Sequence, residues 1–303
     1  MITCLGLSPA LDVTYGVTSL VPGGIHRPEW KVALPGGKSL NVARAARLLD
    51  ADVRAITPLG GAVGDEVHTA LEATGVRAVR VDTAATTRMC VSVVAASDGG
   101  ITEFYENAAE ISDDEWRRLV AELADVEQGW LAVSGSVPVG REPDLAAALA
   151  EAAGRGVRLA VDLRGPALAA VLAETPVELI KVNRVEAEEA VGPGEPSDLA
   201  ARLRASGASC AIVTDGAAGS TAVDGTGAWS VAPVHAGGYT VGAGDSFFAG
   251  LLHGLERSVP LPEALRFAAA TAAANTLRPG AALFDIDDVR MFSDRIVIRT
   301  VER

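Results

Sequence analysis

Short apolar runs alternate with amphipathic segments through the middle of the chain. The apolar runs at 129–134, 157–163, 178–182 and 209–214 predict strands. Apolar residues at helical spacing predict helices at 112–125, 142–154, 165–173, 184–191 and 196–206. Alternating strands and helices are typical of a mainly parallel sheet that helices cover on both faces. The pattern therefore predicts an α/β fold.

The two ends of the chain extend this pattern. Near the N-terminus we expect strands at 2–7, 53–58 and 76–81, and helices at 40–50 and 65–74. Toward the C-terminus we expect a hairpin at 220–224 and 228–234, followed by Ala-rich helices at 245–256, 261–277 and 285–293. No repeat or low-complexity linker divides the chain, which predicts a single domain over residues 1–303.

Four further β-like segments fall outside the alternation. They lie at 11–17, 24–32, 87–96 and 101–106, and Ser-Asp-Gly-Gly joins the last two as a strong hairpin signal. We expect these segments, inserted at about 11–32 and 87–106, to form a small β-sheet. This sheet would project over the mouth of the main sheet as a lid.

Composition narrows the class of partner. The hydrophobic fraction of 49% is ample for a core, and the net charge of −13 argues against nucleic acid or an anionic membrane as partner. Cys4, Cys90 and Cys210 are widely spaced and form no zinc-type cluster, so we expect reduced core thiols. The sequence lacks a signal-like start and any run of 18 apolar residues, which predicts a cytoplasmic protein.

The stretch Gly237–Gly254 contains the most informative motif. Gly242 and Gly244 flank Ala243 ahead of a helix that we expect to open at Asp245. A helix start leaves its first N–H groups unpaired and carries about half a positive charge, which suits a phosphate. A carboxylate here repels an anion unless it has a task. Asp245 is therefore either a general base, taking a proton from an attacking hydroxyl, or a helix cap.

A second motif follows the strand expected at 178–182. Asn183 and Glu186 lie at i and i+3 on one helix face, where they could hold Mg²⁺ directly or through waters. The same Asn-x-x-Glu pattern is typical of a capping box, and both interpretations stay open. Ser134 ends another expected strand, with small residues around it that would let a ligand approach.

Three charged residues outside the strand–helix alternation are further candidates. Gly-Lys-Ser at 37–39 resembles the end of a P-loop, but Val32 stands where that loop requires glycine. What remains is a Gly-Gly turn that presents Lys38 at a helix start, either to a phosphate or to solvent. Arg88 could hold a phosphate with two hydrogen bonds, or lie on a solvent face. Asp12 follows the first strand, where a carboxylate could bind sugar hydroxyls.

Together these motifs resemble the ribokinase/PfkB superfamily, and within it the phosphofructokinase and tagatose-6-phosphate kinase branch. The resemblance runs nearly end to end. Its motifs are Pro9-Ala-Leu-Asp12, Gly36-Gly-Lys38, Asn41-Val-Ala-Arg44, Thr87-Arg88, Ser134-Gly-Ser-Val-Pro138, Lys181-Val-Asn-Arg-Val-Glu186, Asp215-Gly-Ala-Ala-Gly219 and Thr240-Val-Gly-Ala-Gly-Asp245.

The resemblance implies a ribokinase-like three-layer αβα sandwich, with a β lid that often joins two copies into a homodimer. It implies Asp245 as base, with Gly242, Ala243 and Gly244 as the anion hole. It also implies ATP and Mg²⁺, the metal held by Asn183 and Glu186. The residues implied for ATP are Lys181, Asn183, Thr214, Asp215, Gly216, Gly219, Gly244 and Asn275.

The same branch binds a substrate that already carries a phosphate. The resemblance implies Lys38, Arg88 and Arg27 for that phosphate. For the sugar it implies Asp12, Gly37, Asn41, Ser134 and Asp245. Activation by a monovalent cation such as K⁺, through backbone oxygens near Tyr239 and Val241, also occurs in such folds.

Three departures from the family pattern lie on the sugar side. Ser8 replaces the usual Asn, Ser39 replaces Gly and would add a side chain beside the substrate, and the lid stretch reads Tyr105-Glu-Asn-Ala-Ala109. We therefore expect an ATP-dependent kinase of a ketohexose phosphate, of 1-phosphofructokinase, 6-phosphofructokinase or tagatose-6-phosphate kinase type. A free-sugar or nucleoside kinase, and a non-catalytic metabolite-binding relative, are the alternatives.

Overall fold

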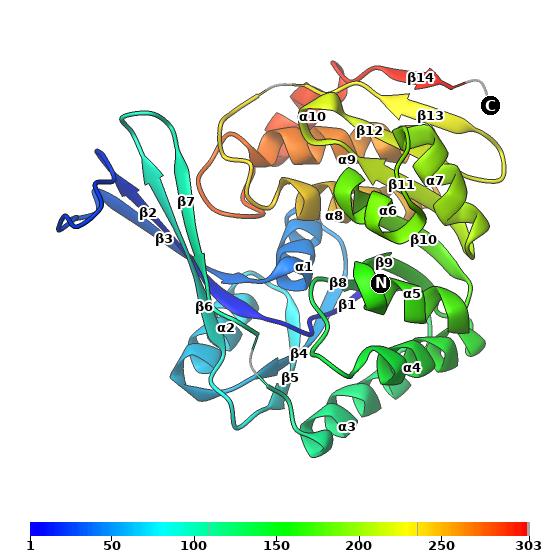
Figure 1. Cartoon of the computed structure of the whole chain (residues 1–303), viewed down its shortest axis with the longest axis horizontal. Coiled ribbons are helices and arrows are strands. Elements are labelled where there is room, and N and C mark those ends of the chain that lie inside the picture. The colour runs from blue at the N-terminus through cyan, green and yellow to red at the C-terminus, as the bar shows by residue number, and fades with distance from the viewer. Residues whose placement is uncertain (109, 235, 302–303) are drawn as a thin grey trace.

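A ten-stranded sheet forms the middle layer of the protein (Figure 1). The computed structural model describes residues 1–108, 110–234 and 236–301. The sheet order is β14-β13-β12-β11-β10-β9-β8-β1-β4-β5, parallel from β11 to β5 and antiparallel from β11 to β14. Its strands are β1 Ile2–Leu5, β4 Val53–Leu59, β5 Arg77–Asp82, β8 Trp130–Ser134, β9 Arg158–Asp162, β10 Val177–Asn183, β11 Ala208–Thr214, β12 Ser220–Val223, β13 Ala228–Val231 and β14 Ile298–Thr300.

Helices cover both faces of this sheet because successive strand residues point to opposite sides. One face packs against α1 Lys38–Leu48, α2 Gly61–Ala73, α8 Ala243–Glu256, α9 Leu261–Asn275 and α10 Ile286–Ser293. The other packs against α3 Asp113–Ala121, α4 Glu142–Gly154, α5 Gly165–Glu174, α6 Arg184–Val191 and α7 Pro196–Ala205. Two cores result, and the predicted three-layer α/β fold is confirmed. None of the described helices is both long and apolar enough to cross a bilayer.

A four-stranded sheet projects from the body as the predicted lid (Figure 1). Its order is β3-β2-β6-β7, with β2 Ala10–Val17, β3 Trp30–Gly36, β6 Arg88–Ala95 and β7 Ile101–Tyr105. The base of one face, including Leu11 and Val13, packs into the core beside α1 and α2. The outer part of the lid stands free of the body.

The structure corrects four sequence-based boundaries. The lid strand expected at 24–32 runs over 30–36 instead, since residues 22–24 are Pro-Gly-Gly and Pro28 has no N–H to donate. The helix expected from 245 begins at Ala243, and the one expected from 65 begins at Gly61. The last helical stretch of 112–125 is a 3₁₀ turn, Glu122–Asp125. The edge strand β14 was not predicted.

Ser39 ties helix α1 to two strands of the main sheet. Only 3% of the residue is exposed. Its hydroxyl donates to the Leu5 carbonyl at 2.6 Å and accepts the Ser134 N–H at 3.2 Å. The expectation that Ser39 would add a side chain beside the substrate is therefore wrong. The hydroxyl points into the sheet and fixes the N-terminus of α1 against β1 and β8.

We predict that Ser39→Ala destabilises the protein by about 1–3 kcal/mol, because buried backbone groups of Leu5 and Ser134 lose their partner. Denaturant unfolding measures the change. Ser206→Ala is the matched control, since the Ser206 hydroxyl bonds the Arg202 carbonyl at the surface, and it should alter stability by less than about 0.5 kcal/mol. Equal stability of the two variants would contradict the role of Ser39.

Candidate active site

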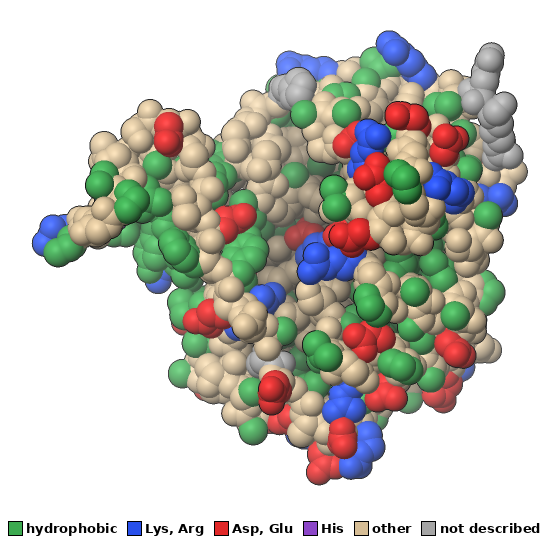
Figure 2. Space-filling model, in the orientation of Figure 1, with side chains coloured by type: hydrophobic (Ala, Val, Ile, Leu, Met, Phe, Trp, Pro, Cys, Tyr) green, Lys and Arg blue, Asp and Glu red, His purple; other side chains and the backbone are tan. Residues whose placement is uncertain are grey.

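The carboxyl ends of four adjacent parallel strands meet at one edge of the main sheet. Strand β8 ends at Ser134, β9 at Asp162, β10 at Asn183 and β11 at Thr214. This edge is where open α/β sheets bind ligands. Figure 2 shows the surface hollowed between the lid and the body, with acidic and basic side chains on the floor of the hollow.

Asp245 lies in the first turn of α8, at this edge. The N-cap is Gly242, whose φ of 76° suits glycine, and Ala243 and Gly244 come next in the helix. The interpretation of Asp245 as the helix cap is wrong, because Gly242, three residues earlier, holds the cap position. The N–H groups of Gly244 and Asp245 have no intrahelical acceptor at these positions, as the predicted anion site requires.

The Asp245 carboxylate is buried and held by one amide. Only 7% of the residue is exposed, and Asn41 Nδ2 donates to Oδ2 at 2.9 Å. Burial raises the pKa of Asp245 to about 6, and the negative charge of Asp162 adds to the rise, while Lys181, Asn41 and Lys38 oppose it. A carboxylate with this pKa is mostly ionised at neutral pH and is a stronger base than an ordinary aspartate.

A second buried carboxylate, Asp162, lies between two lysines. Its Oδ2 is 2.7 Å from Lys181 Nζ and its Oδ1 is 3.1 Å from Lys38 Nζ. Burial opposes ionisation, but the two ammonium groups hold the pKa of Asp162 below its usual range. Asp162 was not predicted as a site residue from the sequence. Asp162 lies at the C-terminal end of a predicted strand, as Ser134 does, and this position was the signal that could have identified it.

Lys38 faces the strand ends. Besides Asp162, its ammonium lies 3.4 Å from Glu186 Oε1. Although burial opposes the charged form, these carboxylates raise the pKa of Lys38, so it stays protonated. Arg88, expected at the same phosphate, instead donates to the carbonyls of Glu106 at 2.8 Å and Ser8 at 3.3 Å. Among the described residues, Lys38 and Arg88 therefore share no hydrogen-bond partner.

Asn183 and Glu186 form the capping box that the sequence left as one alternative. Asn183 Oδ1 accepts the Glu186 N–H at 2.9 Å, and Glu186 Oε2 accepts the Asn183 N–H at 3.0 Å. The capping box leaves Glu186 Oε1 directed toward Lys38, so one oxygen of Glu186 remains for a cation. Among the described residues, no three His, Cys, Asp or Glu side chains gather as a metal site.

A cleft of about 400 Å³ opens beside these groups. It is large enough for a nucleotide-sized ligand. Of the residues expected near ATP, the cleft is lined by Asn183, Thr214, Gly216, Gly219 and Gly244. Its other walls are mostly small and apolar, including Ala272 and Ala273 of α9.

The other residues expected at ATP do not line the cleft. The Asp215 carboxylate pairs with Arg184 at 3.2 Å, and Lys181 is 4% exposed. Asn275 is fully buried: its Nδ2 donates to the Val241 carbonyl at 2.9 Å and its Oδ1 accepts the Ala282 N–H at 2.7 Å. These contacts make Asn275 a support for the loop before α8.

The sugar-side residues gather on the lid side of Asp245. The Asp12 carboxylate lies over Gly36, where a Cβ would fall 2.0 Å from Asp12 Cγ, so only glycine fits. Gly37 has a φ of 83° and is the N-cap of α1. Burial raises the pKa of Asp12, although Arg44 and the Gly37 N–H oppose the rise. Asp12, Gly37, Asn41 and Asp245 are thus brought together.

Three other sugar-side expectations fare differently. Ser134 is 4% exposed and its hydroxyl is engaged by Ser39 at 3.0 Å. Arg27 is exposed in the loop between β2 and β3 at the lid tip, beyond the Gly16–Trp30 pair. That pair is four residues from Asp12, or about 13 Å along a strand. Ala109, in the Tyr105–Ala109 departure, lies outside the described residues.

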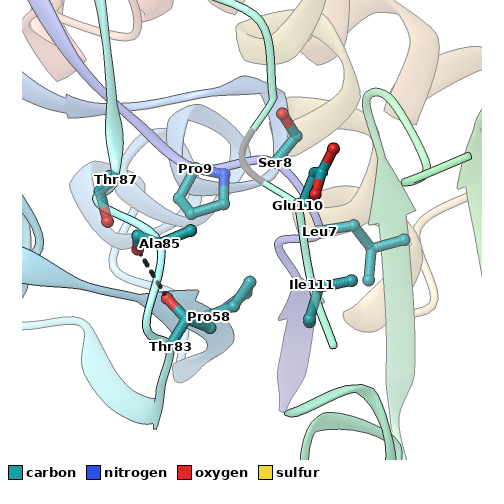
Figure 3. A pocket seen from close by; sticks show the side chains of 9 residues that line it. All are labelled: Leu7, Ser8, Pro9, Pro58, Thr83, Ala85, Thr87, Glu110 and Ile111. Carbon is teal, nitrogen blue, oxygen red and sulfur yellow. Dashed lines mark hydrogen bonds between the residues drawn. The ribbon is translucent and has the colours of Figure 1, made fainter. Parts of the chain in front are cut away.

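A small cavity below the start of the lid is not the substrate site (Figure 3). It is lined by Ser8, Thr83, Thr87 and Glu110 among others, and its volume is about 20 Å³. That volume holds about one water and no sugar.

Comparisons with known proteins find relatives over nearly the whole chain. A family model described as pfkB family carbohydrate kinase matches residues 2–288. ATP-dependent 6-phosphofructokinase isozyme 2 of Escherichia coli K12 is 33% identical over 295 residues, spanning 94% of this chain and 96% of that relative. The 1-phosphofructokinase of Haloferax volcanii is 32% identical over 308 residues, spanning 99% of each.

The crystal structure of Escherichia coli phosphofructokinase-2 in complex with potassium shares 32% identity with a TM-score of 0.90, covering 97% of this chain and 98% of that one. This agreement confirms the predicted ribokinase-like fold with its separate small sheet. The extent of the family match and the identities to two curated relatives decide the assignment. The chain belongs to the pfkB family of carbohydrate kinases.

Proposed function

We propose that this kinase transfers the γ-phosphoryl group of ATP to a hydroxyl of a ketohexose phosphate, with Asp245 as general base. The observation that carries the proposal is the buried Asp245 carboxylate, held by Asn41 in the first turn of α8. It lies between the nucleotide-sized cleft and the sugar-side residues under the lid. The relatives named 6-phosphofructokinase and 1-phosphofructokinase support a phosphosugar acceptor.

In the proposed reaction, Asp245 accepts the proton of the attacking sugar hydroxyl. The new bond joins that oxygen to the γ-phosphorus, and the bond to the β–γ bridging oxygen of ATP breaks. The N–H groups of Gly244 and Asp245, with Lys38 and Lys181 nearby, would stabilise the negative charge on the transferring group. Positioning and charge neutralisation of this kind account for most of the catalysis in phosphoryl transfer.

The residues present fit Mg²⁺ bound mainly through the nucleotide. Glu186 Oε1 lies outside the capping box and within 3.4 Å of the Lys38 ammonium, so this point already favours a cation. Mg²⁺ in kinases keeps several waters and uses one or two carboxylates together with substrate phosphates, which neutralises phosphate charge. We propose Glu186 as the carboxylate, with Asn183 at the edge of the cleft as its partner through water.

Arg88 is the best-supported residue for the phosphate that the substrate brings. Its Nε is buried and has no hydrogen-bond partner within the described structure, although the two terminal nitrogens are satisfied. A buried donor without an acceptor is costly, and a phosphate oxygen would supply one. We propose Lys38 for the transferring phosphoryl group or the substrate phosphate. Arg27 lies at the lid tip, so it would contact a substrate phosphate only if the lid tip reached the active site of a second copy of the chain.

We also propose a site for a monovalent cation and a homodimer. The Escherichia coli relative was solved in complex with potassium, which supports binding of a monovalent cation, and we propose the carbonyls of Tyr239 and Val241 as its site. The lid leaves Ile25 and Phe104 89% and 60% exposed, which supports a homodimer formed through the lid sheets. Mass measurement in solution would test the dimer, and activity with K⁺ against Na⁺ would test the cation.

A coupled ATP assay over a sugar panel tests the proposed function. The panel holds fructose 1-phosphate, fructose 6-phosphate, tagatose 6-phosphate, fructose, ribose and adenosine. Turnover of a ketohexose phosphate alone supports the proposal. Turnover of a free sugar or nucleoside alone overturns it in favour of another kinase on this fold, and a lack of turnover with every compound favours a metabolite-binding relative.

Asp245→Asn should lower kcat by at least ~10²-fold, because the amide cannot accept the hydroxyl proton. The cleft residues are unchanged, so ATP should still bind, as measured by calorimetry. Asp287→Asn, at an exposed carboxylate in the first turn of α10, serves as control and should keep normal kcat. Turnover of Asp245→Asn close to that of the unmodified enzyme would exclude the base assignment.

The pH profile of kcat/KM should fall on the acid side with an apparent pKa near 6, the value that burial and Asp162 give Asp245. The protonated carboxyl group already carries the proton that the base has to accept, so activity is present above this pKa and lost below it. Asp162→Asn removes a negative neighbour and should move the acid limb to lower pH, even if kcat also falls. An acid limb that moves to higher pH would contradict this electrostatic account.

Arg88→Ala should raise KM for the phosphosugar at least ~10-fold and leave KM for ATP nearly unchanged, as loss of a charge-assisted contact predicts. Lys38→Ala tests the two roles proposed for that lysine. If Lys38 binds the substrate phosphate, sugar KM rises; if it contacts the transferring group, kcat falls instead. Unchanged sugar KM in Arg88→Ala would remove Arg88 from the substrate site.

A further inference from the structure

Arg44 is a buried cation that the proposed reaction does not use. It lies on α1, three residues after Asn41, and only 3% of it is exposed. A buried guanidinium is costly unless its N–H groups find acceptors, and an apolar side chain of similar size often gives equal or greater stability. The need for stability alone therefore gives no reason for an arginine here.

The guanidinium contacts three separate segments of the chain. Its Nε donates to the Pro35 carbonyl at 2.9 Å, at the base of the lid strand β3. Its Nη1 donates to the Ala282 carbonyl at 3.5 Å, and its Nη2 donates to the Ala281 carbonyl. Nη2 also lies 3.4 Å from Asn41 Oδ1. A planar fork with five N–H donors can serve these acceptors together, whereas an ammonium cannot.

The contact with Asn41 fixes which way its amide faces. Arg44 only donates, so Asn41 Oδ1 has to face it and Nδ2 has to face Asp245. With the amide turned over, Oδ1 would face the Asp245 carboxylate and the 2.9 Å hydrogen bond would be lost. Arg44 thereby orients the group that orients the proposed base.

The contacts with Ala281 and Ala282 reach the anion-hole turn. The Cα of Gly242 lies so close to this pair that an added Cβ would be 2.6 Å from Ala281 Cβ and 2.8 Å from Ala282 N. Ala282 has a φ of 52°, an uncommon value for a residue with a Cβ. The Asn275 side chain holds its N–H and Arg44 holds its carbonyl. The wall behind Gly242 is therefore fixed by Arg44 from one side.

We propose that Arg44 is a positioning residue that sets the base of the lid, the Asn41 amide and the backbone behind Gly242 with a single side chain. This inference rests on the proposed function, because it assigns Arg44 to the geometry of Asp245. Asp12 and Asp245 favour its charge, and although burial lowers the pKa of Arg44 to about 10, it stays protonated at neutral pH.

The test compares Arg44→Met and Arg44→Lys with Arg47→Met. Arg47 lies on the same helix, but its side chain is partly exposed and pairs with Asp50 at 3.1 Å. Both Arg44 variants should lower kcat at least ~10-fold, since small misplacements of reacting groups cost that much or more. KM for ATP should change less than about 3-fold, because Arg44 does not line the cleft. Arg47→Met should leave both unchanged.

The pH profile separates the charge of Arg44 from its shape. Asp245 interacts electrostatically with Asp162, Lys181, Lys38 and Arg44. Loss of a positive neighbour in Arg44→Met should move the acid limb of kcat to higher pH, whereas Arg44→Lys should leave the limb in place with kcat still reduced.

Hydrogen exchange of the ligand-free protein gives a readout that does not depend on activity. Peptides covering 239–247 and 280–284 should exchange faster in both Arg44 variants than in Arg47→Met. If Arg44→Met does not fold, Arg44→Lys carries the test. Normal kcat and normal exchange in Arg44→Lys would overturn the inference. The proposed function fails separately, if the unmodified enzyme phosphorylates no ketohexose phosphate.

Discussion

The balance of buried charge around Asp162 is the constraint on which the rest of the site depends. One carboxylate, 1% exposed, holds the ammonium groups of Lys38 and Lys181 at 3.1 and 2.7 Å. The lysines bring positive charge to the point where the proposed reaction would transfer a phosphoryl group. Asp162 offsets the cost of burying Lys181, while 39% of the Lys38 side chain stays exposed. Burial raises the pKa of Asp245, and the same negative charge adds to the rise and so strengthens the proposed base. Asp162 thus influences both the lysines proposed for the phosphoryl group and the proposed base.

The fold could be predicted from the sequence because its signals are periodic and local. Apolar runs of strand length alternate with helical stripes from 112 to 214, and this alternation is sufficient to predict a parallel sheet between two helix layers. The glycines before Asp245 and the polar ends of β8 and β10 could be found for the same reason. Each lies where a strand ends or a helix begins, and the chain topology brings those points to one edge.

Some side-chain positions could not be predicted from the sequence, because they depend on contacts between distant segments. Lys38 was assigned to the substrate phosphate, but its position is set by Asp162 and Glu186, which are 124 and 148 residues away. Ser39 looked like an addition beside the sugar, and instead bonds to β1 and β8. The lid strand was misplaced because apolar residues at 24–32 suggested β-structure, while Pro28 and the glycines before it decided where the strand begins.

The acidic charge of the whole chain does not conflict with two polyanionic substrates. The net charge of −13 is spread over the surface, where screening limits its reach to roughly 10 Å at moderate salt. At the strand ends, burial weakens screening, so Lys38, Lys181 and the N-terminus of α8 act on a ligand at short range. Three carboxylates lie among these cations, so the site without ligands is close to neutral. A nearly neutral site would not hold phosphate tightly in the absence of substrate. Mg²⁺ can then supply extra positive charge when it arrives with the nucleotide.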